Sequence, residues 1–171
     1  GRYGTAADGG VKFYALDNEP MLWNVAHRDV HPEPTSYDEM RARTIEYATA
    51  VKAADPTAQV LGPAEWGWTA YFYSAAEMVD GGDWKSRRPD RRAHGNLPYV
   101  EWYLRQMAEH ERVTGKRLLD YLDLHYYPQC GVALAPAGDA LTKEKRLRCT
   151  RSLWDPAYVD ESWIGEPVRL L

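Results

Sequence analysis

Three short clusters in this sequence carry the side chains that acid–base chemistry needs. They are Asp17-Asn18-Glu19-Pro20, Ala64-Glu65-Trp66-Gly67-Trp68 and His125-Tyr126-Tyr127-Pro128. Each cluster follows a short apolar segment. Carboxyl groups, an amide, an imidazole and several aromatic rings are therefore candidates for one shared site, provided that the fold brings the three clusters together.

The apolar segments before the clusters are predicted β-strands. They cover residues 11–16, 59–62 and 118–125, and the first, between Gly9-Gly10 and Asp17-Asn18, is typical of a buried parallel strand. Two predicted helices separate the strands. The first follows a capping box formed by Ser36 and Glu39 and stops before Pro56, and the second runs from Pro98 to Thr114 with Gly115 as its stop.

This strand–helix alternation predicts a parallel sheet with right-handed crossovers, hence an α/β fold. Functional residues of such sheets lie at the carboxyl ends of the strands, so the three clusters are expected to converge on one rim. Two regions are less regular. The basic stretch 85–92 favours a solvated loop over a phosphate site, and 138–171 is expected to hold one or two short helices.

Glu19 is the strongest catalytic candidate. A general acid needs a carboxyl group that stays protonated near neutral pH, which a partly dry site and a second nearby carboxylate favour. The amide of Asn18 can bind a sugar 2-hydroxyl group, a contact that strengthens in the transition state of glycoside cleavage. The alternative is that Asn18-Glu19-Pro20 is an ordinary turn.

The aromatic residues suggest contacts with sugars. The chain has 7 Trp and 12 Tyr against only 2 Phe, so rings with a polar edge dominate. If Trp66 and Trp68 lie in extended chain, both rings point to the same side and form a stacking platform. The alternative is packing between sheet and helix. His125 and Tyr126 are expected to orient a neighbouring carboxylate, or else to form a purely structural pair.

Several other site types find little support. His27, Asp29, His31 and Glu33 alternate along a loop, but their spacing matches no known metal site and Pro32 and Pro34 favour a rigid polar loop. No phosphate loop or nucleophile elbow is present.

The net charge of −4 argues against nucleic acid and anionic membranes as partners, and no apolar run is long enough for a transmembrane helix. Cys130 and Cys149 could pair in a secreted protein and would stay free in a cytosolic one, so the sequence leaves their state open.

Taken together, the motifs resemble glycoside hydrolase family 44. The resemblance rests on Phe13 to Pro20 with Leu22-Trp23 and His27 to Pro32, on Pro63 to Trp68, on His125 to Pro128, and on Ser152 to Pro156 running into Tyr158 to Ile164. It covers roughly residues 14–164. Each motif is weak alone, but together and in this order they are specific.

The resemblance implies a secreted, retaining endo-β-1,4-glucanase of the cellulose or xyloglucan type. It implies a (β/α)8 barrel of which residues 1–171 form one partial segment, about strands 4 to 6 with their helices, because 171 residues are too few for a barrel of about 250. Glu19 takes the acid/base role. Asn18, Trp23, Trp66, Trp68, His125, Tyr126 and Tyr127 are the expected substrate-binding residues. No cofactor or metal is required, and the sequence neither shows nor excludes a structural calcium ion.

The family's nucleophile, a second glutamate after the seventh strand, has no match in this chain. Glu65 follows the wrong strand, and Glu166 is expected at a helix start, so neither is a good substitute. The isolated chain is therefore expected to be inactive without the rest of the barrel. Two alternatives remain open: a non-catalytic glycan-binding or degenerate relative, and a mannanase or xylanase of the same clan.

Overall fold

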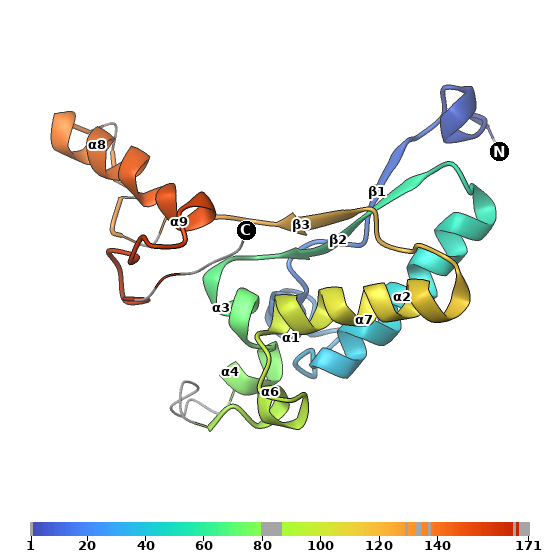
Figure 1. The fold of residues 1–171 in the computed structure, drawn as a ribbon, viewed down its shortest axis with the longest axis horizontal. Helices are drawn as coiled ribbons and strands as arrows, with labels where there is room; N and C mark the ends of the chain where they lie inside the picture. Colours follow the sequence, from blue (N-terminus) through green and yellow to red (C-terminus); the bar gives the residue numbers. More distant parts are fainter. Residues whose placement is uncertain are drawn as a thin grey trace. The chain divides into compact units, whose positions relative to one another are not determined.

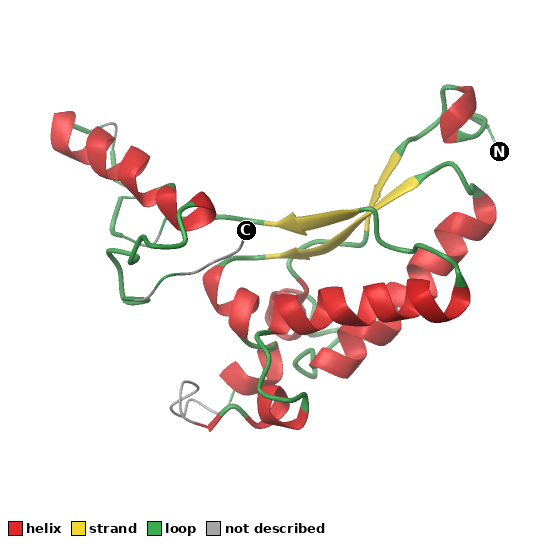
Figure 2. Ribbon diagram, in the orientation of Figure 1, coloured by secondary structure: helices red, strands yellow, loops and turns green. Residues whose placement is uncertain are grey.

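The computed structural model describes residues 2–79, 87–128, 130–132, 135–136, 138–165 and 167. The chain forms two compact units, Gly1–His125 and Tyr126–Leu171, and each is described by itself. Figure 1 and Figure 2 show the first unit as a small sheet with helices and the second as two helices with connecting loops. Within the described residues, no helix is both long and apolar enough to cross a bilayer.

The sheet of the first unit is parallel, as the alternation predicted. Its strands are β1 (Phe13–Ala15), β2 (Gln59–Glu65) and β3 (Tyr121–Leu124), in the order β1-β2-β3. Tyr14 pairs with Val60, and Leu61 pairs with Tyr121. The register between β2 and β3 shifts at Pro63/Glu65, where Ala64 adopts a left-handed φ of 57°. The resulting bulge lies at the carboxyl end of β2.

The two long helices also form close to their predicted places. α2 (Tyr37–Ala54) and α7 (Tyr99–Thr114) contact each other and lie on one side of the sheet (Figure 1). Gly115 ends α7 in a left-handed conformation, as predicted. The capping box of α2 is only half present, because Ser36 Oγ accepts from the Glu39 N–H whereas the Glu39 carboxylate contacts His31 and Arg43 instead.

The core of the first unit lies between the sheet and these helices. Ala48, Val60 and Leu118 form its centre, and tyrosines replace the usual phenylalanines around it. The phenol groups of Tyr37 and Tyr103 are buried and hydrogen-bonded, Tyr37 to the Phe72 and Leu97 carbonyls and Tyr103 to Thr44 Oγ1. The polar edges of these rings thus satisfy buried backbone and side-chain groups.

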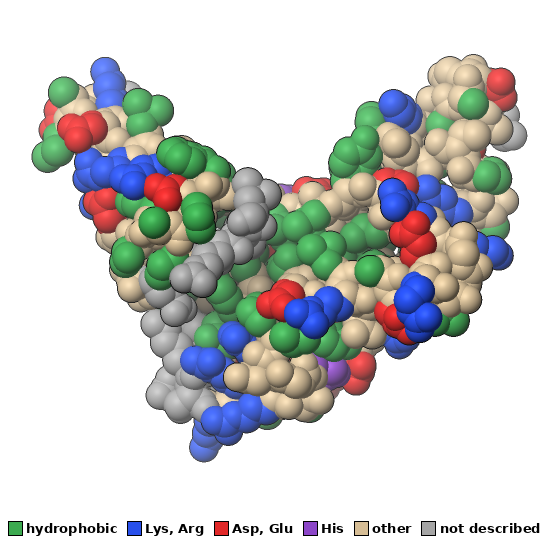
Figure 3. All heavy atoms as spheres, in the orientation of Figure 1, with side chains coloured by type: hydrophobic (Ala, Val, Ile, Leu, Met, Phe, Trp, Pro, Cys, Tyr) green, Lys and Arg blue, Asp and Glu red, His purple; other side chains and the backbone are tan. Residues whose placement is uncertain are grey.

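The prediction that residues 11–16 are buried is wrong for most of this strand. All three residues of β1 are exposed, Phe13 by 50 %. In Figure 3, hydrophobic side chains gather over the region of the strands; exposed apolar side chains there include Val11, Phe13, Tyr14, Tyr121 and Leu122. The reason is that β1 and β3 are edge strands and no described element covers the face opposite α2 and α7.

Short helices fill the connections: η1 (Ala6–Asp8), η2 (Pro20–Leu22), α1 (Trp23–Ala26), α3 (Trp68–Phe72), α4 (Ala75–Met78) and α6 (Pro89–Ala93). The predicted basic loop 85–92 is therefore partly helical, and its first two residues lie outside the described part of the chain. The guanidinium groups of Arg88 and Arg91 lie 5.7 and 5.5 Å from the centre of the Tyr73 ring.

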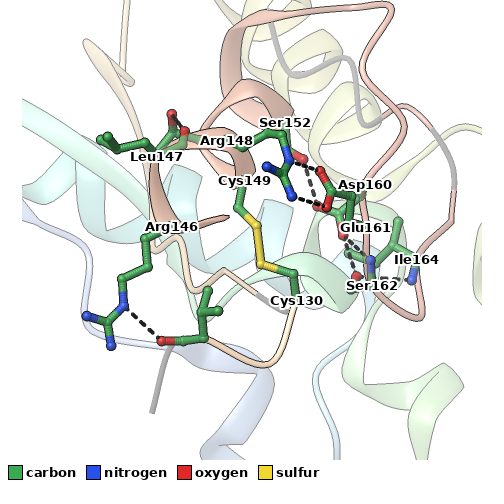
Figure 4. Close-up of a disulfide and its surroundings, with 12 residues drawn as sticks. Cys130, Arg146, Leu147, Arg148, Cys149, Ser152, Asp160, Glu161, Ser162 and Ile164 are labelled. Atoms are coloured by element: carbon green, nitrogen blue, oxygen red, sulfur yellow. Dashed lines mark hydrogen bonds and ion pairs between the residues drawn. A yellow bond between two sulfur atoms is a disulfide. The ribbon is translucent and has the colours of Figure 1, made fainter. Parts of the chain in front are cut away.

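The second unit contains α8 (Ala140–Cys149) and α9 (Arg151–Trp154), which confirms the expectation of short helices there. A disulfide joins Cys130 to Cys149, and Arg148 forms a bidentate ion pair with Glu161 (Figure 4). Asp160 is buried and accepts from the Ser152 hydroxyl at 2.6 Å. The cysteines, whose state the sequence left open, are thus paired within one unit.

Candidate functional site

Glu19 lies where the chain leaves the sheet after β1. The parallel pairing continues past the strand itself, because the Leu16 N–H donates to the Leu61 carbonyl and the Glu19 N–H to the Ala64 carbonyl, at 3.0 and 2.8 Å. Glu19 is consequently held beside the end of β2 by a backbone hydrogen bond. This confirms that the first two clusters meet at one edge of the sheet.

Strained backbone marks the same place. Asp17, Glu19 and Ala64 have φ angles of 84°, 48° and 57°, in the left-handed region that non-glycine residues rarely adopt. The Asn18 N–H donates to Asp17 Oδ1 at 2.8 Å, and the Asn18 side chain is exposed. Such strain costs free energy and is often retained where a side chain must point in a particular direction.

The side chain of Glu19 pairs with His125 from the end of β3. Glu19 Oε1 lies 2.8 Å from His125 Nδ1, and the two side chains are 21 % and 30 % exposed. The backbone of His125 is fixed as well: its N–H donates to the Glu65 carbonyl, and its carbonyl accepts from the Tyr71 hydroxyl. A carboxyl group, partly open to solvent and oriented by an imidazole, is suited to transfer a proton to a bound substrate.

A second carboxyl group, Glu65, lies behind this pair. Its side chain is only 2 % exposed, and burial raises the pKa of Glu65 from 4.5 to about 8. The N–H groups of Met21 and Trp66 lower this pKa, whereas the charge of Glu19 raises it further. Glu65 is therefore neutral at pH 7 and does not face solvent, which argues against a nucleophilic role.

The predicted platform of two tryptophans is not formed. Trp68 is the first residue of α3 rather than part of an extended segment, and its side chain is 2 % exposed in contact with Tyr71. The stacking geometry expected for Trp66 and Trp68 is therefore wrong, because Gly67 and the start of α3 break the alternation. Trp66 is half-buried, and its Nε1 donates to Thr69 Oγ1 at 3.0 Å.

Trp23 lies in α1, directly after the Glu19 turn, and faces a cavity. This cavity has a volume of about 710 Å³ and extends between β1, α1 and α2. Among the described residues Trp23, Asp17 and His31 line it, whereas Glu19, Trp66 and His125 do not. Trp23 and Glu19 are thus near each other in the chain without sharing this cavity, and a common groove for Glu19, Trp66 and His125 stays a prediction.

Tyr126 and Tyr127 begin the second unit. The Tyr126 hydroxyl donates to the Cys149 carbonyl at 2.7 Å, and burial raises its pKa to about 12. Tyr127 is exposed. Tyr126 therefore has a structural contact in its own unit, and the substrate-binding role of both tyrosines stays a prediction.

In the 27–33 loop, where four potential metal ligands alternate, His31 has protein partners. His31 Nε2 lies 2.7 Å from Glu39 Oε1 on α2, and its ring packs edge-on against Trp23. Throughout the described part of the chain, no three His, Cys, Asp or Glu side chains are grouped so that they could hold a metal ion. The rigid polar loop is the interpretation that these contacts support.

The sequence suggested Glu65 only as a replacement nucleophile, and its burial near Glu19 was not predicted. The available signal was its place at the end of the second apolar segment. It also missed Tyr71, which anchors the His125 carbonyl from 54 residues away and follows no local pattern. Glu166 lies outside the described residues.

Comparison with known proteins identifies relatives of this arrangement. A family model described as glycoside hydrolase family 44 matches residues 1–130. Endoglucanase A of Paenibacillus lautus is 40 % identical over 171 residues, which cover 96 % of this chain and 23 % of that protein. Beta-mannanase/endoglucanase A of Caldicellulosiruptor saccharolyticus is 35 % identical and covers 96 % of this chain, but only 13 % of its own length is matched.

Solved structures show the same fold. The bifunctional glucanase-xylanase CelM2, from a metagenome library, superimposes with a TM-score of 0.90 at 44 % identity over 99 % of this chain and 33 % of that one. A family 44 xyloglucanase from Paenibacillus polymyxa gives a TM-score of 0.77 at 39 % identity over 96 % of this chain and 32 % of that one. The chain thus spans about a third of these structures and a quarter or less of the curated relatives.

Proposed function

The chain belongs to glycoside hydrolase family 44, and from this membership we propose that it contributes the general acid/base to a retaining endo-β-1,4-glucan hydrolase. The observation that carries the proposal is the hydrogen bond between Glu19 and His125, which joins the ends of two parallel strands at a partly exposed rim. Glu19 is the acid/base, His125 orients it, and Asn18 is placed beside it to contact the sugar.

The proposed reaction is a double displacement. A nucleophilic carboxylate about 5–5.5 Å from the acid attacks the anomeric carbon, while protonated Glu19 gives its proton to the leaving oxygen. Ionised Glu19 then takes a proton from water, which releases the sugar from the enzyme. Glu65 is buried and neutral, so it does not supply the nucleophile. We assign the nucleophile to a part of the enzyme outside this sequence.

The exposed apolar face of the sheet supports a larger barrel. β1, β2 and β3 correspond in this proposal to strands four, five and six, and residues 1–171 form one partial segment of the catalytic barrel. β1 and β3 are edge strands, and no described element covers the face of the sheet opposite α2 and α7. In this proposal, further strands of the barrel pair with the two edges and enclose that face.

The proposed substrate is a β-1,4-linked glucan such as cellulose or xyloglucan. A structure of the Paenibacillus polymyxa relative with xyloglucan supports this substrate class, and relatives named for glucanase, xylanase and mannanase activities define the competing ones. Trp23, Trp66 and Tyr127 are the aromatic residues proposed to contact the glycan. Secretion is proposed as well, because the Cys130–Cys149 disulfide is typical of an oxidising compartment.

The test compares the full-length enzyme with its Glu19→Gln variant on xyloglucan, carboxymethylcellulose, mannan and xylan. We expect activity on the two glucans and its loss in Glu19→Gln, with Glu109→Gln, an exposed change on α7, as the control that keeps it. Undiminished hydrolysis by Glu19→Gln would contradict the acid assignment. Binding of glucan without any turnover by the unchanged enzyme would instead support a non-catalytic, glycan-binding relative.

A further inference from the structure

The Ala64–Glu65 segment at the end of β2 bonds to the main chains of both members of the proposed acid–histidine pair. The carbonyl of Ala64, the residue before it, accepts from the Glu19 N–H, and the carbonyl of Glu65 itself accepts from the His125 N–H. Both hydrogen bonds measure 2.8 Å. The backbone at Glu65 therefore sets how far apart the Glu19 and His125 main chains lie.

The side chain of Glu65 turns away from solvent, toward the helices. It is buried among Met21 of η2, Trp66 and Tyr99 of α7, and the charge of Glu19 raises the pKa of its carboxyl group. The bulge at Ala64 explains this direction, because the register shift between Pro63 and Glu65 interrupts the alternation of side chains in β2. A strained backbone is thus used to place a carboxyl group inside the protein.

The buried carboxyl group is incompletely bonded. Its Oε2 atom has no hydrogen-bond partner among the described residues, and the same is true of the nearby Tyr99 hydroxyl. Burial raises the pKa of Tyr99 well above its usual range, so both groups are neutral. Most buried polar atoms in proteins are satisfied, and those that are not often have a functional reason.

One contact links this carboxyl group to the acid. The Met21 N–H, which lies near the Glu65 side chain and favours its charge, belongs to the residue two positions after Glu19. Glu19 has a left-handed backbone and no side-chain cap stabilises the start of η2. The Glu65 side chain and the Ala64 carbonyl therefore both contact the turn that carries Glu19, at Met21 and at Glu19 itself.

We propose that Glu65 is a positioning residue of the hydrolytic site: as a buried hydrogen-bonding group, it holds the Glu19 turn and the His125 strand end in register for proton transfer. This proposal rests on the acid/base function assigned to Glu19. Glu65 acts through Glu19 and does not touch the substrate. Burial keeps its carboxyl group uncharged, so no second negative charge lies near Glu19 to repel the ionised acid after proton transfer.

The conservative change Glu65→Gln separates this role from one that needs a charge. Glutamine keeps the shape, one acceptor and one donor, so we expect kcat on xyloglucan to stay within about threefold of the unchanged enzyme. Glu65→Leu keeps the volume but removes both hydrogen-bonding groups, and we expect it to lower kcat about 10- to 100-fold while KM changes less than about threefold. Equal losses in Glu65→Gln and Glu65→Leu would overturn the neutral role.

The decisive experiment is a double-mutant cycle in the full-length enzyme with Glu19→Gln and Glu65→Leu, measured as kcat on xyloglucan. If Glu65 acts through Glu19, the Leu change has no further effect once Glu19 is replaced. If the two losses multiply, Glu65 is only a structural residue and the proposal is wrong. If Glu65→Leu does not fold, the cycle is made with Glu65→Met, a more flexible side chain that also lacks both hydrogen-bonding groups, and read in the same way.

The same data distinguish this proposal from the proposed function. Retained activity in Glu19→Gln alone would refute the acid assignment, whatever Glu65 does. A large loss in Glu19→Gln together with an independent, multiplicative loss in Glu65→Leu would leave the acid assignment standing and refute only the positioning role.

Discussion

Replacing Glu65 by Gln is expected to change how the stability of the protein depends on pH. Burial raises the pKa of Glu65 to about 8, whereas the unfolded chain has the ordinary value of 4.5. Between these two values the folded state holds a proton that the unfolded state has released. The free energy of unfolding must therefore fall as pH rises through this window, and glutamine, which does not titrate, removes that fall.

The magnitude follows from proton linkage. One proton bound only by the folded state changes the free energy of unfolding by about 1.4 kcal/mol for each pH unit. Between about pH 5.5 and 7.5, the unchanged protein should lose roughly 3 kcal/mol relative to Glu65→Gln. The stabilisation from protonated Glu65 is complete below pH 4.5 and is lost as pH approaches 8.

Urea unfolding of the full-length protein and of Glu65→Gln at several pH values measures this difference. Glu109→Gln is the matched control. Arg112 lowers the pKa of Glu109, so Glu109 is ionised in both the folded and the unfolded protein throughout the window. Isotope-edited infrared spectroscopy adds a direct view, since a protonated carboxyl band at pH 7 should vanish in Glu65→Gln. If the difference in free energy of unfolding between the unchanged protein and Glu65→Gln stayed constant from about pH 5.5 to 7.5, and no protonated carboxyl band appeared, the argument from burial would be refuted.

Three further predictions concern other parts of the chain. Trp68→Ala should destabilise the first unit by about 3–5 kcal/mol in urea unfolding, because the side chain is core and not a sugar platform; a loss of glucan affinity at unchanged stability would contradict this. Replacing Cys130 and Cys149 together by Ser should lower stability by about 3 kcal/mol, given their separation of 19 residues, and identical melting curves would refute the pairing. His125→Ala should lower kcat on xyloglucan about 10- to 100-fold by releasing Glu19, and an unchanged pH–rate profile would argue against that contact.

The order of the elements could be predicted from the sequence because it depends on local patterns, and the rim followed from that order. Short apolar runs that end in polar clusters predicted β1, β2 and β3, and apolar residues at helical spacing predicted α2 and α7. Since parallel strands end at one edge, the meeting of Glu19 and His125 followed from topology alone, although 106 residues separate them.

The features that sequence reasoning missed depend on tertiary geometry. Trp68 is buried because Gly67 starts a helix where an extended segment was expected, and alternation over three residues is too short to decide between them. The inward direction of Glu65 depends on a bulge and a left-handed Ala64, and alanine gives no sign of that conformation. The exposure of β1 depends on which elements cover the sheet, which the pattern of one strand does not contain.

The function of Glu19 as general acid is tested most directly by the leaving-group dependence of Glu19→Ala in the full-length enzyme. Without the acid, hydrolysis of xyloglucan, whose leaving sugar needs a proton, should fall about 10²- to 10⁴-fold. Formation of the glycosyl-enzyme from a dinitrophenyl cellobioside, whose leaving group departs unprotonated, should remain close to the rate of the unchanged enzyme. If the first-step rates on both substrates fell equally, or neither fell, Glu19 would not be the acid.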